Sequence, residues 1–155
     1  MNRRTFLAGA GGATLVTLAG CLGDGYSTRE FHGQAVPLVP TEDAHEWYEA
    51  DDALFVDTRQ TELEFHQARI EDAVYSPAAE GLSEGDPLEG VDHARRIVTY
   101  CVCPHALAGS RAGVLIGQGY ESVYALDEGL QDWYERRLPM EGTNIHGDLE
   151  AEYHD

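Results

Sequence analysis

Two cysteines separated by a single residue are the side chains best suited to covalent chemistry in this chain. Cys101 and Cys103 directly follow the apolar run Ile97–Tyr100, whose β-forming residues predict a buried strand of a parallel sheet. A helix rich in small residues is expected over about 110–117. A thiol between a parallel strand and a helix lies where α/β folds place reactive groups. Amide groups there stabilise a thiolate, so the pattern predicts a cysteine nucleophile.

The position of the strand end favours Cys101 as this nucleophile, and Cys103 is the alternative if the register slips by two residues. The two thiols could instead cycle between a dithiol and a disulfide, whose tight ring would be strained and labile. A metal site formed by both cysteines and His105 is weakly supported, because structural zinc sites have four ligands and no fourth is visible. No metal and no cofactor are therefore expected.

The elements that would position these thiols follow an alternating pattern. Thr61 and Glu64 form the S/T-x-x-E capping box, which predicts a helix from about residue 62 to 67. Two further helices are expected, one beginning near Thr41 and one carrying Trp133. Alternation of strands and helices predicts an α/β domain with a central parallel sheet of four to five strands flanked by helices. The strands are expected at 36–39 (on an edge), 53–56, 73–76, 97–100 and 123–126.

Several of these segments, in this order, resemble the rhodanese-like domain family. The strand LFVDTR ends at Asp57 and Arg59, and EFHQARIEDAVYSP follows it at 64–77. Residues 96–133 then run strand, Cys101, loop, helix, GY, VYAL and EGLQDW. The resemblance implies a rhodanese fold and a sulfurtransferase, whose cysteine takes a sulfane sulfur, holds it as a persulfide and passes it on. The implied partners are a small sulfur donor and a thiol or cyanide-like acceptor.

Residue roles also follow from the resemblance. Cys101 would be the nucleophile, and Asp57 would support the structure around it. Arg59 would be an ion-pair partner of Asp57 or a surface residue. The residues expected to surround the donor are Val102, Pro104, His105, Ala106, Leu107, Arg111 and Arg59.

The loop after Cys101 departs from the family pattern. The next arginine, Arg111, comes ten positions later, and the loop is expected to be longer than usual. A loop without cations attracts the thiosulfate dianion poorly. Related phosphatases and arsenate reductases use C-(x)5-R as a cationic clamp for oxyanions, and neither cysteine has it. A rhodanese fold that serves as a non-catalytic interaction module is the other alternative.

The first 21 residues resemble an export leader. Paired arginines at Arg3 and Arg4 precede a short apolar run that is too short to span a bilayer comfortably. The run ends in L-A-G-C, which resembles a lipobox with Cys21 as the lipidated residue, and the arginine pair resembles a twin-arginine signal. The expected organisation is a signal peptide at 1–21, a tether at 22–35, the domain at 36–141 and an acidic tail at 142–155. Such a protein would be exported and lipid-anchored on the outer face of the cell membrane.

The charge of the chain is strongly negative. It contains 10 basic and 28 acidic residues and no lysine, for a net charge of −18. Without Arg3 and Arg4, 8 basic residues face 28 acidic ones, which gives −20. This disfavours nucleic acid and anionic membrane surfaces as partners, because both require a basic footprint. The composition resembles that of proteins from salt-loving organisms, and we expect a monomer that touches the membrane only through its lipid.

Overall fold

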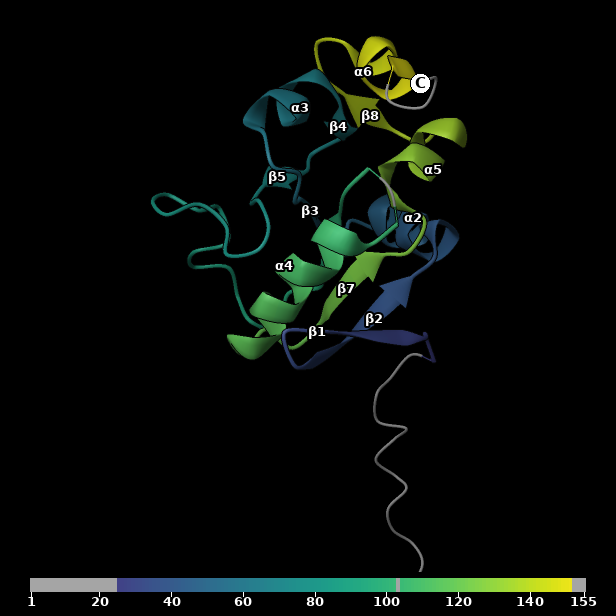
Figure 1. Ribbon diagram of the computed structural model, residues 1–155. Helices are drawn as coiled ribbons and strands as arrows, with labels where there is room; N and C mark the ends of the chain where they lie inside the picture. Colours follow the sequence, from purple (N-terminus) through teal and green to yellow (C-terminus); the bar gives the residue numbers. More distant parts are fainter. Residues whose placement is uncertain (1–24, 103, 152–155) are drawn as a thin grey trace, which may run out of the picture.

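A six-stranded sheet forms the centre of the computed structural model, which describes residues 25–102 and 104–151. The strand order is β1-β2-β7-β6-β3-β5 (Figure 1). β1 pairs with β2 antiparallel, and the pairs formed by β2, β7, β6, β3 and β5 are parallel. The expectation of a mainly parallel α/β sheet is therefore confirmed. The strands are β1 (Thr28–Phe31), β2 (Gln34–Val39), β3 (Leu54–Asp57), β5 (Val74–Tyr75), β6 (Ile97–Tyr100) and β7 (Val123–Leu126).

Helices cover both faces of this sheet. The helix α4 packs against β1, β2, β6 and β7 on one face, and α2 and α5 pack together on the other. A small second sheet pairs β4 with β8 near α3 and α6. The bounds of these elements are α2 (Thr41–Glu49), α3 (Glu62–Gln67), α4 (Ala106–Gly117), α5 (Gly129–Glu135), α6 (Ile145–Ala151), β4 (Arg69–Ile70) and β8 (Met140–Glu141).

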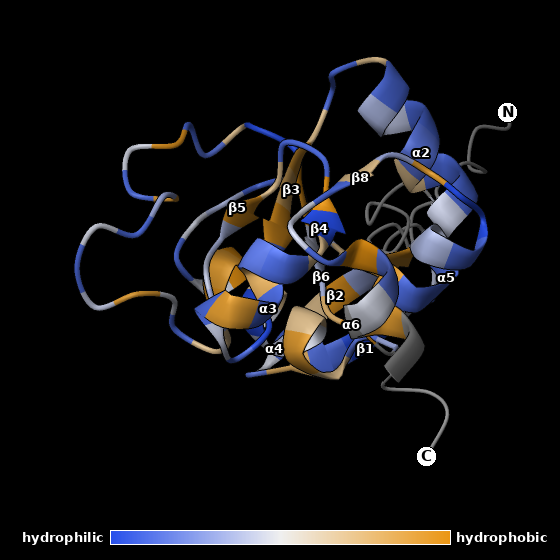
Figure 2. Cartoon of the chain, turned by 90° about the horizontal axis from the view of Figure 1, so that it is seen from above, coloured by the Kyte–Doolittle hydropathy of each residue, from blue (hydrophilic) through white to orange (hydrophobic). Residues whose placement is uncertain are grey.

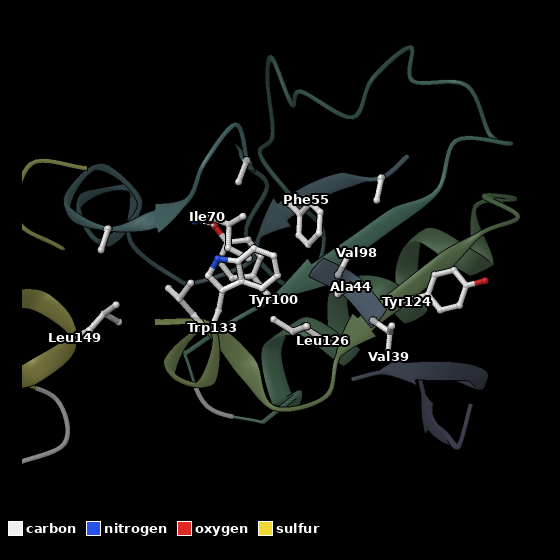
Figure 3. Packing of buried hydrophobic residues seen from close by; sticks show 14 residues of the cluster. Val39, Ala44, Phe55, Ile70, Val98, Tyr100, Tyr124, Leu126, Trp133 and Leu149 are labelled. Carbon is white, nitrogen blue, oxygen red and sulfur yellow. Dashed lines mark hydrogen bonds between the residues drawn. The ribbon is translucent and has the colours of Figure 1, made fainter. Parts of the chain in front are cut away.

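The core on the α2/α5 side is built around Trp133. Its ring lies 5.5 Å from that of Phe55 and 5.8 Å from that of Tyr48, and its indole N–H donates to the Pro139 carbonyl at 3.0 Å. Figure 3 shows Trp133 beside Tyr100 and Ile70 within this cluster. The polar end of the indole is thereby satisfied while its rings are buried, which is the arrangement that a buried tryptophan needs.

Seen from above, apolar residues concentrate in the sheet, whereas α2 is largely polar and the long connection between β5 and β6 mixes polar and apolar residues (Figure 2). Side chains alternate along β6, since Val98 and Tyr100 join the Trp133 core while Ile97 faces the core beneath α4. Continuation of this alternation directs Cys101 toward α4, where it belongs to the same core as Ile97.

The N-terminal part of the domain differs from the sequence prediction. The predicted tether 22–35 is wrong for its second half, because Thr28–Phe31 forms β1 and pairs with β2. For the same reason β2 is not an edge strand, and Leu38 N–H donates to the Ser27 carbonyl at 2.9 Å. The predicted leader with Cys21 lies outside the described residues, as does Cys103.

Part of the segment expected as an acidic tail at 142–155 belongs to the folded domain, because residues 145–151 form α6. Leu149 of this helix is fully buried in the Trp133 core, and Ile145, one turn earlier, packs against the same core. These two apolar residues four positions apart give the helix one buried face, a short signal that is easily overlooked in an acidic segment. In the described part of the chain, none of the helices is long and apolar enough to cross a membrane.

Candidate functional site

Cys101 lies at the C-terminal edge of the parallel sheet, directly after β6. The register pairs Tyr100 of β6 with Asp57 of β3, so the residues that follow these two strands lie side by side. The Cys101 carbonyl accepts a hydrogen bond from Leu130 N–H at 2.8 Å, and the Val102 carbonyl accepts one from Gln131 N–H at 3.2 Å. The first turn of α5 thus holds the backbone of Cys101 and Val102 in place.

The helix α4 begins at Ala106, earlier than the sequence predicted. Only residues 102–105 separate Cys101 from this helix, so the prediction of a long loop is wrong. Its first α-helical hydrogen bond runs from Gly109 N–H to the His105 carbonyl at 2.8 Å. His105 occupies the N-cap position with a left-handed backbone (φ 32°) and makes no side-chain cap hydrogen bond. Ser110, where the helix was expected to begin, is therefore inside it. The positive end of the helix dipole faces the loop that carries Cys101.

A cavity of about 410 Å³ opens beside Cys101. Cys101 is only 3% exposed and Arg59 only 2%, so these two residues form its buried floor, whereas Gln60 and Thr61 are exposed at its rim. The thiol thus borders a space large enough for a small molecule and has little direct contact with solvent. The lining residues are Arg59, Gln60, Thr61, Glu64, Cys101, Val102, Ala106 and Leu107.

Electrostatically, the floor is dominated by the ion pair between Asp57 and Arg59. Arg59 Nη2 lies 2.6 Å from Asp57 Oδ2, its Nε donates to both carboxylate oxygens, and its backbone N–H donates to Oδ1. Burial alone would lower the pKa of Arg59, but hydrogen bonds and attraction from Asp57 outweigh it and hold the pKa above its usual value. The expected ion pair is therefore present, and Arg59 is not a surface residue.

Tyr100 lies beneath this pair. Its hydroxyl accepts a hydrogen bond from Ile70 N–H at 3.1 Å. Complete burial, followed by the negative charge of Asp57, raises the pKa of Tyr100 well above its ordinary value. Tyr100 therefore stays neutral at the base of the site and ties β4 to the end of β6.

The structure brings together most of the residues expected around a donor, but not all of them. Val102, Ala106, Leu107 and Arg59 line the Cys101 cavity, with Asp57 directly behind Arg59. Pro104 instead borders a neighbouring cavity of about 460 Å³, whose other lining residues are Asp127, Glu128, Gln131, Asp132 and Glu135.

His105 and Arg111 point away from the cavity. The His105 ring lies between Asp127 Oδ1, at 3.6 Å, and Arg29 Nη1, at 3.4 Å. Among the described residues, no group of three or more His, Cys, Asp or Glu side chains is placed to hold a metal ion.

The prediction that Arg111 contacts the donor is contradicted by its position inside α4. Its Nε donates to Ser76 Oγ at 3.0 Å, and its guanidinium lies 3.8 Å from Asp86. Burial lowers the pKa of Arg111, and the charge of Asp86 partly offsets this effect. Arg111 therefore anchors the connection after β5 to the helix.

Gln60, Thr61 and Glu64 line the cavity but were not identified as site residues from the sequence. The capping box that Thr61 forms with Glu64 was predicted and is present, with Thr61 Oγ1 accepting from Glu64 N–H. Its proximity to Cys101 depends on the pairing of β3 with β6, which brings the start of α3 to the same edge of the sheet.

A larger cavity of about 620 Å³ lies elsewhere, among residues of α5, β8 and α6 such as Tyr134, Met140 and Ile145. It shares no lining residue with the Cys101 cavity. Size alone therefore does not identify the reactive site, which is located by its thiol and by its place at the sheet edge.

Both the sequence and the fold of this chain are similar to those of known proteins. The sequence profile of the rhodanese-like domain matches residues 40–136. A solved protein from Bacillus halodurans is similar, with a TM-score of 0.58, 20% identity and coverage of 68% of this chain and 77% of that chain.

Two further similar structures have names that state an activity. The polysulfide-sulfur transferase homodimer of Wolinella succinogenes gives a TM-score of 0.53 at 19% identity, covering 72% of this chain and 82% of that one. The thiosulfate sulfurtransferase of Pseudomonas aeruginosa gives 0.54 at 21%, covering 71% of this chain but only 21% of that longer one.

Proposed function

Because this chain belongs to the rhodanese-like domain family, we propose that it is a sulfurtransferase in which Cys101 carries a sulfane sulfur to a thiophilic acceptor. The observation that carries the proposal is the position of Cys101, at the end of β6 and in the wall of a cavity that also contains the first turn of α4. Two similar structures are named as sulfur transferases, which supports the same reaction class.

The proposed reaction has two displacement steps and needs no external oxidant. The Cys101 thiolate attacks the outer sulfur of the donor, the donor's S–S bond breaks, and its electron pair leaves with the remainder of the donor. The new Sγ–S bond holds the transferred sulfur as a persulfide. A nucleophilic acceptor then attacks the outer sulfur, and the Sγ–S bond breaks to regenerate the thiolate.

The first turn of α4 would stabilise the negative charge that Cys101 carries before and after transfer. A helix N-terminus is equivalent to about half a positive charge, and it acts strongly where water is largely excluded. The buried Asp57–Arg59 pair would be a positioning device, because it holds the end of β3 and the start of α3 against the cavity. Arg59 also donates to the Ala68 carbonyl at 2.5 Å, which links the cavity floor to the end of α3.

A turnover assay tests this proposal. The purified protein is given a panel of sulfane donors with cyanide as acceptor, and thiocyanate formation is measured for the wild type and for single Cys→Ser variants. We expect Cys101→Ser to abolish turnover and Cys103→Ser to retain it. Equal loss in both variants would instead support the dithiol alternative, in which both thiols are required.

A second candidate function is a non-catalytic interaction module, and the 3% exposure of Cys101 favours it. In that case the thiol would be a small core residue beneath α4. Slow alkylation of Cys101 by iodoacetamide in the folded protein, at the rate expected for global unfolding, together with absence of turnover for every donor, would support this function. Alkylation orders of magnitude faster would exclude it.

We also propose that the protein is exported and held by lipid at Cys21. The basis is the leader-like pattern of residues 1–21, and Cys21 is followed by only six residues before β1 begins at Thr28. A segment of that length spans at most about 20 Å when extended, so the domain would stay close to the membrane surface. The Cys21→Ser substitution should move the protein from the membrane fraction to the soluble fraction when cells that express it are fractionated. Persistence in the membrane fraction would contradict the proposal.

A further inference from the structure

We propose that the Cys101 cavity accepts persulfides of neutral or cationic small thiols as sulfur donors and discriminates against thiosulfate and carboxylate-bearing persulfides. This inference rests on the sulfurtransferase function proposed above and adds the charge class of the donor. It follows from the charges that surround the cavity.

The first observation is that the cation of the cavity is already neutralised. Arg59 is the only cationic side chain among the described residues that line the cavity. Its guanidinium makes three hydrogen bonds to the Asp57 carboxylate, with distances of 2.6–3.1 Å, and both side chains are buried. A paired guanidinium of this kind has little attraction left for a second anion.

The second observation is a carboxylate in the cavity wall. Glu64 lines the cavity, and its Oε2 accepts hydrogen bonds from the backbone N–H and the hydroxyl of Thr61. Both donors are uncharged, so they orient the carboxylate without cancelling its charge. The formal charges of Arg59, Asp57 and Glu64 therefore sum to −1 beside the thiol.

The third observation concerns the other side of the loop that follows Cys101. The neighbouring cavity at Pro104 has four acidic lining residues, Asp127, Glu128, Asp132 and Glu135. Arg136 neutralises Asp132 in part, through an exposed contact of 2.7 Å. An anion that approaches the loop from this side meets the same sign of charge, which slows its encounter at low ionic strength.

The helix dipole does not reverse this preference. The half positive charge at the start of α4 is matched with the full negative charge of the Cys101 thiolate that it stabilises. A thiosulfate dianion would therefore have to approach one negative thiolate and one negative carboxylate without a free cation. An ammonium group on the donor would instead be attracted to Glu64.

The transfer step is balanced without a further reactant. The Cys101 thiolate attacks the outer sulfur of R–S–SH and forms the Sγ–S bond. The S–S bond of the donor breaks, R–S⁻ leaves with the electron pair, and the proton stays on the transferred sulfur. Only the charge on R distinguishes good donors from poor ones in this account.

A matched pair of donors provides the test. The persulfides of cysteamine and of 3-mercaptopropionate share a two-carbon chain and differ in bearing an ammonium or a carboxylate. We measure the second-order rate of Cys101 persulfidation in the purified protein with each, and with thiosulfate. At low salt we expect the ammonium donor to react about tenfold faster than the carboxylate donor, with thiosulfate slowest, and the gap to narrow as salt rises.

Two variants with the same change in net charge distinguish the effect of the charge in the cavity from the effect of the net charge of the molecule. Glu64→Gln removes the cavity carboxylate, and glutamine still completes the capping box with Thr61. It should reduce the ratio of the two rates by about threefold or more. Gln118→Arg adds one charge at an exposed position at the far end of α4 and should leave the ratio unchanged.

Each outcome has a defined meaning. Equal rates for the two persulfides, a faster reaction with thiosulfate, or equal shifts of the ratio in both variants would overturn the charge preference while the sulfurtransferase function stood. Absence of persulfide on Cys101 with every donor would overturn the sulfurtransferase function itself, and the inference with it.

Discussion

Arg59 Nη2 lies 2.6 Å from Asp57 Oδ2, and the two side chains are 2% and 0% exposed, with Arg59 in the wall of the cavity that Cys101 lines and Asp57 behind it. Their spacing of two residues places one at the end of β3 and the other in the turn that leads to α3. The pair thus couples the electrostatics of the cavity to the stability of the sheet edge.

Removal of one partner of this pair should be costly. Asp57→Asn leaves the buried guanidinium without its counter-ion, which destabilises a protein by about 3–5 kcal/mol. Denaturant unfolding monitored by tryptophan fluorescence measures the loss. Asp132→Asn is the matched control, because its pair with Arg136 is partly exposed and should contribute less than about 1 kcal/mol. Similar losses in the two variants would show that the buried pair has no special role.

Tyr100 should make stability depend on pH under alkaline conditions. Its pKa is raised in the folded protein by burial and by Asp57, so the folded state keeps a proton that the unfolded chain releases above about pH 10. The associated stability is fully present below pH 10 and is lost as the pH rises toward the folded pKa.

Unfolding measurements between pH 8 and 11 on wild type and Tyr100→Phe test this expectation. The variant should be less stable at pH 8, because Ile70 N–H loses its acceptor, and should lose stability less steeply above about pH 10. Burial is the largest cause of the raised pKa values of Tyr48 and Tyr75. These two tyrosines leave some dependence of stability on alkaline pH in the variant. An unchanged slope would contradict the assignment to Tyr100.

The docking of β1 on α4 should depend on two glycines of α4. A Cβ at Gly109 would overlap the Phe31 ring, whereas a Cβ at Gly113 would lie 2.5 Å from the Phe31 carbonyl oxygen. Each Gly→Ala variant should therefore lose about 1–3 kcal/mol, measured by thermal unfolding. Addition of Phe31→Ala should relieve Gly109→Ala but not Gly113→Ala, because alanine removes the ring that meets Gly109 but keeps the carbonyl group and the Cβ that meet Gly113. Rescue of both variants would contradict the observed contact.

The helix α6 should contribute to stability as a part of the domain. Leu149 is fully buried, so Leu149→Ala should cost about 2–5 kcal/mol in denaturant unfolding. Leu63→Ala is the matched control, because Leu63 is 65% exposed on α3 and should change stability by less than about 0.5 kcal/mol. Equal effects would mean that the packing of α6 adds nothing to the core.

Local sequence patterns were sufficient for two central strands and for one helix. The runs 97–100 and 123–126 were predicted with their observed bounds, and the capping box predicted α3, because each signal is contained in a few adjacent residues. The edge strand was wrong, since the pairing of β1 with β2 is a tertiary contact that the glycine-bearing segment 22–35 does not reveal.

For a similar reason, the residues that line the cavity could not all be predicted from the sequence. Arg111 follows Cys101 by ten residues and was expected beside the donor, but it lies inside α4 and contacts Ser76 and Asp86. Glu64 is 37 residues before Cys101 and becomes its neighbour only through the parallel pairing of β3 with β6. Spacing along the chain predicts neither relationship.

The central claim is that Cys101 carries sulfur, and peptide-level mass spectrometry tests it most directly. The purified protein is incubated with cysteamine persulfide, its thiols and persulfides are blocked by alkylation, and the peptide containing Cys101 and Cys103 is fragmented. We predict the gain of one sulfur atom on Cys101, retained in Cys103→Ser and absent in Cys101→Ser. A peptide without added sulfur, or one with the sulfur on Cys103, would contradict this account.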